Sequence, residues 1–93
     1  MHFILFYDFV ENIVERRAPY RAEHLALARE WAADGRLRLG GAFTDPADGA
    51  ALVFAAEDLA QVEQFVAADP YVANGLVTAW RIRPWTVVVG ADL

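Results

Sequence analysis

The chain begins with a stretch in which apolar side chains alternate between two faces, a pattern typical of a β-strand. Over residues 2–10, the odd-numbered residues from 3 to 9 fall on one face, and Ile4 and Phe6 fall on the other. Both faces of this strand are therefore apolar. A layer of helices covers only one face of a sheet, so we expect a second layer, another subunit, to cover the other face.

The next segment predicts a helix. After a polar connection over residues 11–19 that Pro19 closes, the spacing of apolar residues becomes helical from about residue 20 to Asp34, and Gly35 ends the helix. At 100° per residue, the face that we expect to be buried carries Tyr20, His24, Leu27, Ala28 and Trp31. His24 is thus predicted to lie near the centre of the buried face.

A hairpin and a second helix follow. Residues 36–39 alternate as a strand that reaches a bend at Gly40-Gly41, and a turn over residues 44–49 joins it to a third strand over residues 51–55. Asp58 and Gln61 resemble a capping box that opens a helix through about Ala68. The buried stripe of this helix is expected to hold Leu59, Val62 and Val66.

The end of the second helix directs an acidic residue toward the core. Pro70 disfavours the α region for Asp69, so the helix ends there. Asp69 also continues the stripe of Val62 and Val66, which predicts that its carboxylate points to the core side. The last strand is expected over residues 76–89, where Pro84 indicates a sheet edge or a bend.

The order of predicted elements is βαββαβ, the split βαβ or ferredoxin-like arrangement of an α+β domain. In this fold both helices cover one face of a four-stranded antiparallel sheet. Ninety-three residues are few for two domains, so we expect residues 1–93 to form one domain. The apolar side chains on the other sheet face predict a homodimer through that face.

Composition narrows the classes of function. The chain has no cysteine, which excludes disulfides, thiolate metal sites and cysteine nucleophiles and fits a cytoplasmic protein. Its net charge is −5, so a nucleic-acid partner is not expected. No stretch approaches the roughly 18 apolar residues of a membrane span. The first apolar run stops at Asp8 without a basic leader, so we expect neither a membrane protein nor a secreted one.

Two residues carry candidate chemistry. The imidazole of His24 exchanges a proton near neutral pH, and an Asp69 carboxylate within hydrogen-bond reach would fix its tautomer and hold it as a base. The pattern alone favours the structural alternative, a core histidine bonded to the backbone and an acid at a helix end. Arg21, three residues before His24, would either hold an anionic substrate or pair with a glutamate on the helix surface.

Other residues leave similar alternatives. A set of aromatic side chains would line a pocket or fill the core and an interface: Tyr20, Trp31, Tyr71, Trp80 and Trp85. Two histidines without cysteine give no usual metal-ligand spacing. We therefore expect no metal and no cofactor.

Several short motifs, taken in order, resemble the YCII-related (YciI-like) family. They are Arg21-x-x-His24-Leu25, Asp34-Gly35-Arg36-Leu37, Ala68-Asp69-Pro70-Tyr71, Gly75-Leu76 and Arg83-Pro84-Trp85. The resemblance covers nearly the whole chain. It implies a ferredoxin-like monomer that forms a dimeric α/β barrel, with a proposed active-site pair that matches His24 and Asp69. Where relatives often have Gly-Pro, this chain has Gly41-Ala42-Phe43, so the pocket wall there is expected to differ.

The resemblance leaves the reaction open, although a dehydrochlorinase of a chlorinated hydroxyquinone resembles the same family. The first hypothesis is a cofactor-independent lyase- or isomerase-like enzyme in which His24 moves a proton on a small cyclic or aromatic substrate while Asp69 orients it. Arg21 and Tyr71 are then the candidate substrate-binding residues. The alternatives are a non-catalytic dimeric module that binds a small ligand or a protein, and a monooxygenase with the same barrel. Fold alone does not choose among them.

Overall fold

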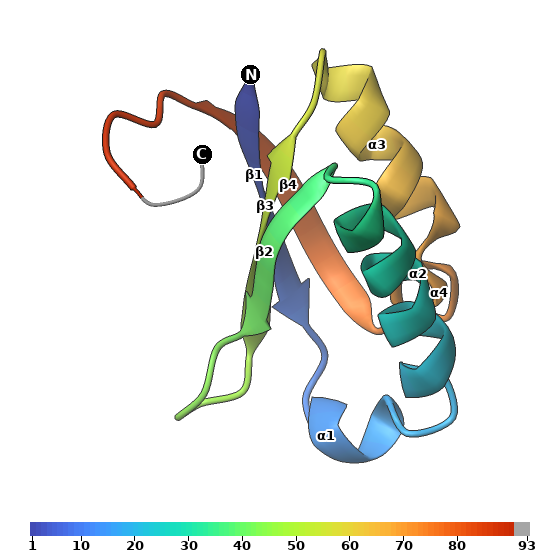
Figure 1. Ribbon diagram of the computed structural model, residues 1–93. Coiled ribbons are helices and arrows are strands. Elements are labelled where there is room, and N and C mark those ends of the chain that lie inside the picture. Colours follow the sequence, from blue (N-terminus) through green and yellow to red (C-terminus); the bar gives the residue numbers. More distant parts are fainter. Residues whose placement is uncertain (91–93) are drawn as a thin grey trace.

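The computed structural model describes residues 1–90, in which a layer of helices packs against one face of a twisted sheet (Figure 1). The elements in chain order are β1 (His2–Phe9), α1 (Ile13–Arg16), α2 (Arg21–Ala33), β2 (Leu37–Ala42), β3 (Gly49–Ala55), α3 (Leu59–Ala68), α4 (Pro70–Ala73) and β4 (Val77–Trp85). The strand order is β2-β3-β1-β4, and all neighbours are antiparallel. The predicted ferredoxin-like α+β fold is confirmed.

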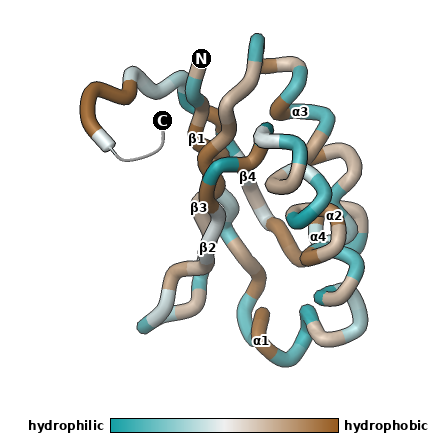
Figure 2. Tube along the Cα trace, viewed as in Figure 1, coloured by the Kyte–Doolittle hydropathy of each residue, from teal (hydrophilic) through white to brown (hydrophobic). Residues whose placement is uncertain are grey.

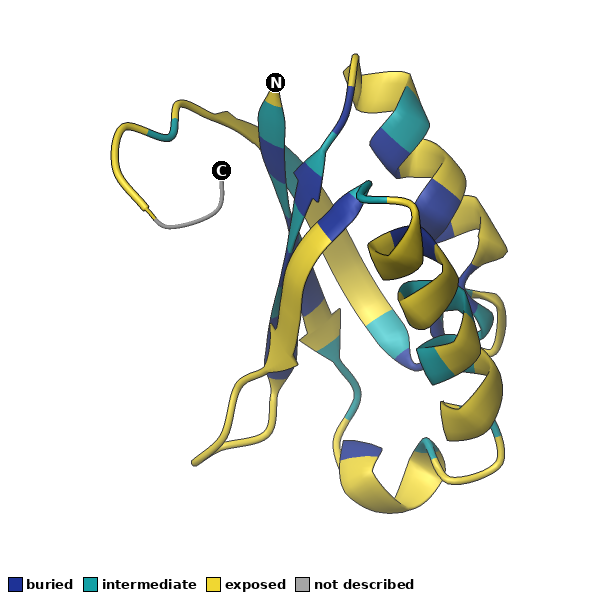
Figure 3. Cartoon of the chain, viewed as in Figure 1, coloured by how far each residue is buried: buried dark blue, intermediate teal, exposed yellow. Residues whose placement is uncertain are grey.

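The two faces of β1, both apolar in the sequence, differ in burial. Phe3, Leu5 and Tyr7 are at most 2% exposed and face the helices, whereas Ile4 and Phe6 on the opposite face are only partly buried. Figure 3 shows the buried segments gathered between the sheet and the helices. β4 lies at the sheet edge, where a proline costs the fewest ladder hydrogen bonds.

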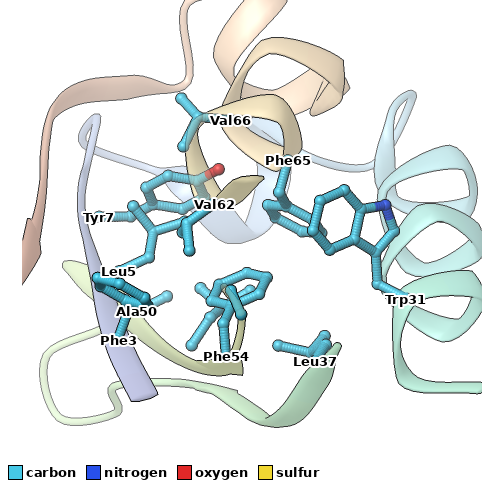
Figure 4. Close-up of a cluster of buried hydrophobic side chains, with 12 residues drawn as sticks. Phe3, Leu5, Tyr7, Trp31, Leu37, Ala50, Phe54, Val62, Phe65 and Val66 are labelled. Atoms are coloured by element: carbon cyan, nitrogen blue, oxygen red, sulfur yellow. The ribbon is translucent and has the colours of Figure 1, made fainter. Parts of the chain in front are cut away.

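The centre of the core is a cluster of aromatic rings between the sheet and two helices (Figure 4). Trp31 of α2 meets Phe65 of α3 with ring centroids 5.3 Å apart, and both rings meet Phe54 of β3 at 5.8 and 5.2 Å. All three pairs are edge-to-face, the arrangement that aromatic quadrupoles favour. This cluster joins the two long helices to the sheet.

The end of α2 is fixed by its own sequence. Gly35 takes a positive φ of 89°, and its amide donates to the carbonyl of Ala32 at 3.1 Å. The Asp34 carboxylate accepts from the backbone amide of Arg36 and from its guanidinium, which lowers the pKa of Asp34. The same guanidinium lies 3.7 Å from the ring centroid of Trp31. The Asp34-Gly35-Arg36 motif therefore ties the helix end to the start of β2.

Two connections contain short helices that the sequence analysis did not predict. In the connection over residues 11–19, α1 buries Ile13 to 2% exposure against Tyr71 and Leu76. After α3, α4 begins directly at Pro70, whose missing amide hydrogen costs nothing at the first position of a helix. None of the helices in residues 1–90 has the length and hydropathy of a membrane span.

The buried stripe of α3 differs from the expected one. It consists of Val62, Phe65 and Val66, whereas Leu59 is 44% exposed. At 100° per residue, Leu59 lies about 120° around the helix from Phe65, so it stands at the edge of the stripe. The prediction was right for the two valines and wrong for Leu59.

The last strand is shorter than expected and ends at Trp85 rather than near Val89. Trp85 pairs with His2, where β1 begins, so later residues have no partner strand within residues 1–90. Val88 and Val89 are each 86% exposed, in an apolar segment that Figure 2 shows clear of the helices. Gly40 and Gly41 also differ from expectation, because they lie inside β2 rather than at a bend.

Candidate functional site

Three hydrogen-bond donors from three other positions converge on Asp69, at the junction between α3 and α4. Asp69 is 0% exposed and is the one buried charged side chain within residues 1–90. Its Oδ2 accepts from the Tyr7 hydroxyl at 2.8 Å. Its Oδ1 lies 2.8 Å from Nδ1 of His24 and accepts from the amide of Tyr71 at 3.0 Å. These contacts compensate the carboxylate for its loss of water.

The local sequence explains why this carboxylate turns inward. Asp69 is extended (φ −75°, ψ 119°), as expected of a residue before proline. It ends α3 and caps the N-terminus of α4, because its side chain accepts from the amide of Tyr71. The same side chain therefore terminates one helix, starts the next and reaches the core.

His24 lies on α2 with its ring held on two sides. The ring stacks on that of Tyr71 with centroids 3.9 Å apart and planes 4° apart, and Nδ1 meets the Asp69 carboxylate. A carboxylate only accepts, so this contact assigns the proton of the neutral imidazole to Nδ1. Nε2 then carries the lone pair, and it has no hydrogen-bond partner among residues 1–90. The ring is therefore held through Nδ1, and Nε2 is its nitrogen without a partner in the described range.

Tyr7 is a member of this group that the sequence analysis did not single out. Burial, the nearby charge of Asp69 and the hydrogen bond to it all raise the pKa of the Tyr7 hydroxyl, in that order of size. The hydroxyl thus remains a donor to the carboxylate. The signal in the sequence was the place of Tyr7 in an apolar strand, since a buried tyrosine hydroxyl needs a hydrogen-bond partner.

A cavity of about 470 Å³ opens beside this group, between α2 and the strands β2, β3 and β1. This volume falls within the range of small-ligand sites. Its apolar lining includes Leu25, Ala28, Leu37 and Leu52, and its polar lining includes Arg17, Arg21, His24 and Tyr71. Gly40 leaves space there, since a Cβ at this position would lie 3.5 Å from Leu52 Cγ, in ordinary contact without strain.

The structure brings the four predicted site residues together. The predicted hydrogen bond between His24 and Asp69 is confirmed, and its pocket is partly open, with the His24 side chain 15% exposed. Tyr71 stacks on His24, and Arg21 lines the cavity. Arg21 forms no ion pair with any residue of the described range 1–90, so the alternative of a surface glutamate partner does not hold.

The other candidate aromatic residues have different places. Trp31 belongs to the core cluster, and Tyr20, Trp80 and Trp85 do not line the cavity. Over residues 1–90, no three histidine or acidic side chains gather closely enough to hold a metal ion.

Comparison with known proteins agrees with this fold. The family model of the YCII-related domain matches residues 1–86. An uncharacterized protein of Haemophilus influenzae is 28% identical over 97 residues, an alignment that covers 95% of this chain and 99% of that protein.

Two solved structures are similar in fold. The 5-chloro-2-hydroxyhydroquinone dehydrochlorinase of Burkholderia phenoliruptrix, in complex with 2,5-dihydroxybenzoquinone, is 24% identical with a TM-score of 0.79, covering 92% of this chain and 94% of that one. An uncharacterized NIPSNAP domain protein of Burkholderia xenovorans is 18% identical with a TM-score of 0.53, covering 99% and 96% of the two chains. The motifs around His24 and Asp69, the ferredoxin-like sheet and the match over residues 1–86 agree, and the chain belongs to the YCII-related domain family.

Proposed function

We propose that this protein is a small cofactor-independent enzyme of the lyase or isomerase kind, with His24 as its general acid and base. One observation carries the proposal: Nδ1 of His24 lies 2.8 Å from a fully buried carboxylate while the ring lines a cavity. This arrangement leaves Nε2 available to a bound substrate. The proposed substrate is a small cyclic or aromatic molecule, because the cavity is small and mostly apolar.

In the proposed reaction, Nε2 accepts a proton from an acidic C–H or O–H group of the substrate. The electron pair of the broken C–H or O–H bond stays on the substrate. In an elimination this pair forms the new double bond, and the leaving group departs with the electron pair of the bond that held it to the substrate. In an isomerisation the imidazolium returns the proton to another atom. Asp69 orients the imidazole and stabilises its charged form, while Tyr7 and the amide of Tyr71 hold Asp69 in place.

Of the two reactions, we favour an elimination by analogy with the dehydrochlorinase of Burkholderia phenoliruptrix. The fold of that enzyme matches 92% of this chain. Removal of hydrogen chloride needs a base for the proton and a site that admits a flat ring. His24 and the apolar cavity beside it provide both.

The test compares the two histidines of the chain. The His24→Gln and His2→Gln variants are assayed with wild type for chloride release from 5-chloro-2-hydroxyhydroquinone and for deuterium uptake by cyclic ketones in D₂O. His24→Gln is expected to lower the rate by about 10²–10⁴. His2 does not line the cavity, so His2→Gln should retain the wild-type rate. Equal rates in wild type and His24→Gln would contradict the proposal.

We also propose that two copies associate through the sheet face opposite the helices. This face carries the partly buried Ile4, Phe6 and Val53 and the exposed Leu39, and a second copy of the same face would cover them. Arg81 already lies over the ring of Phe6, with its guanidinium carbon 4.5 Å from the centroid. Light scattering at micromolar concentration should give the mass of a dimer, and a monomer mass would contradict this assembly.

We also propose a cytoplasmic location for the protein, which the absence of cysteine suits.

A further inference from the structure

The charge of the cavity is opposite to that of the chain. The chain has 13 acidic residues and 8 basic ones, all of them arginine. Four of these eight arginines line the cavity, namely Arg17, Arg21, Arg29 and Arg38, and no aspartate or glutamate lines it. A concave, partly apolar site with a single sign of charge attracts ions of the opposite sign.

Two of these arginines act on the same hydroxyl group. Arg17 follows α1 and Arg21 begins α2, so a short link joins them, and both line the cavity. Neither forms an ion pair within residues 1–90. Both guanidinium charges act on the Tyr71 hydroxyl, where they oppose the rise in pKa that burial causes. That hydroxyl also has no hydrogen-bond partner among the described residues.

The remainder of the cavity is shaped for a flat apolar group. Leu37 and Leu52 line it from the strands, and the stacked rings of His24 and Tyr71 line it from the helices. A ligand that matches both ends has a ring against the leucines and an acidic group at the arginines. Guanidinium groups bind carboxylates through paired, charge-assisted hydrogen bonds.

We propose that the cavity binds small cyclic or aromatic carboxylates, whose carboxylate group is held by Arg17, Arg21 and the Tyr71 hydroxyl. This inference rests on the proposed function and specifies its substrate class. The ring of the bound acid lies beside His24, within reach of Nε2. The same two arginines stabilise negative charge that develops on the ring when His24 removes a proton.

The experiment titrates benzoate and benzamide separately into the protein by isothermal calorimetry. The two probes have nearly the same shape, but only benzoate is charged. Benzoate is expected to bind at least about tenfold more tightly than benzamide, and added salt should weaken benzoate binding alone. The Arg17→Gln/Arg21→Gln variant should lose this preference. Arg16→Gln is the matched control, because it removes the same charge from a neighbouring residue that does not line the cavity.

A second measurement needs no variant. In NMR spectra of the wild-type protein, benzoate should shift the signals of His24 and Tyr71 and leave those of Arg81 and Arg83, on the opposite sheet face, unchanged. Equal affinity for the two probes, no saturable binding of benzoate, or shifts confined to the opposite face would each overturn the inference.

These outcomes are separate from the test of proton transfer. His24→Gln should lose catalysis and keep benzoate binding within a few-fold, because the carboxylate group is held by other residues. An enzyme that depends on His24 but binds benzamide as well as benzoate would retain the proposed function and refute the carboxylate specificity.

Discussion

The two ends of α2 show how one helix face serves two purposes. His24 and Trp31 are seven residues apart, two turns of the same face. Trp31 meets Phe54 and Phe65 edge-to-face in the core, and the Arg36 guanidinium covers its ring. His24 stacks flat on Tyr71, meets a buried carboxylate and borders a cavity. The same helix thus has an apolar, filled end and a polar, open end.

The difference arises from what the neighbouring elements present to each end. Opposite Trp31, Phe54 and Phe65 fill the space between the helices and the sheet. On the side of His24, β2 presents Gly40, whose missing side chain leaves space beside Leu52. Packing at the Trp31 end therefore stabilises the fold, whereas the His24 end borders the cavity. Mutations at the two ends should separate stability from binding.

The largest loss of stability is expected at the apolar end. Phe65→Ala removes a fully buried ring that contacts both Trp31 and Phe54, and it should lower the free energy of unfolding by about 3–5 kcal/mol. Urea denaturation measures this loss. Phe43, which is 46% exposed, is the control, and Phe43→Ala should cost far less. Equal losses in the two variants would show that the aromatic cluster does not dominate the core.

At the polar end, two substitutions distinguish the hydrogen bonds of the Asp69 side chain from its negative charge as contributions to stability. Asp69→Ala leaves three donors without an acceptor and should cost about 2–4 kcal/mol. Asp69→Asn keeps an oxygen for the amide of Tyr71 and His24 Nδ1, and its NH₂ group donates to the Tyr7 hydroxyl oxygen. It should cost only about 1 kcal/mol while lowering activity. An Asn variant as unstable as Ala would indicate that the charge itself stabilises the fold.

Tyr7→Phe should have a smaller effect at neutral pH and a distinct one at high pH. Loss of its hydrogen bond to Asp69 should cost about 1–2 kcal/mol. The pKa of Tyr7 is raised in the folded protein, so the folded state holds this proton more tightly than the unfolded state. The stability that the neutral hydroxyl provides is present below pH about 10, the ordinary tyrosine pKa, and is lost as the pH rises further.

The measurement for Tyr7 is urea denaturation across pH 7 to about 11. The wild type should lose stability above pH about 10 more steeply than Tyr7→Phe does. Tyr20→Phe is the control, since Tyr20 has no hydrogen bond to Asp69. Parallel pH profiles for wild type and Tyr7→Phe would contradict the role of this hydroxyl.

The smallest loss is expected for His24→Gln. The side chain is partly exposed and contributes one hydrogen bond and one ring contact, so thermal melting should reveal a loss of about 1 kcal/mol. Because this loss is small, the variant remains folded for the activity and binding assays. A loss as large as that of Phe65→Ala would instead make His24 a structural residue and favour a non-catalytic module.

Local patterns in the sequence were enough to predict most of the fold. The alternation along β1 predicted which side chains share a face, Gly35 predicted the end of α2, and Pro70 predicted the end of α3. These signals depend on neighbouring residues only, because backbone sterics and the periods of helix and strand act over a few positions. The same reasoning placed Asp69 toward the core, where it contacts His24.

Partners that are distant in the chain could not be read from such patterns. Tyr7 and Asp69 are 62 residues apart, and only the packing of α3 and α4 against the sheet brings the hydroxyl to the carboxylate. Ile13 likewise has no periodic neighbours, and it is buried because Tyr71 and Leu76 lie beside it.

The sequence by itself determined the order of the elements, the two faces of β1 and the pair of residues with candidate chemistry, since each follows from local spacing. Tertiary structure alone decided where β4 ends, because a strand continues only while its neighbour offers backbone partners, and β1 begins opposite Trp85. It also decided that Arg17 joins Arg21 at the cavity, since that depends on how α1 packs and not on the spacing of charges along the chain.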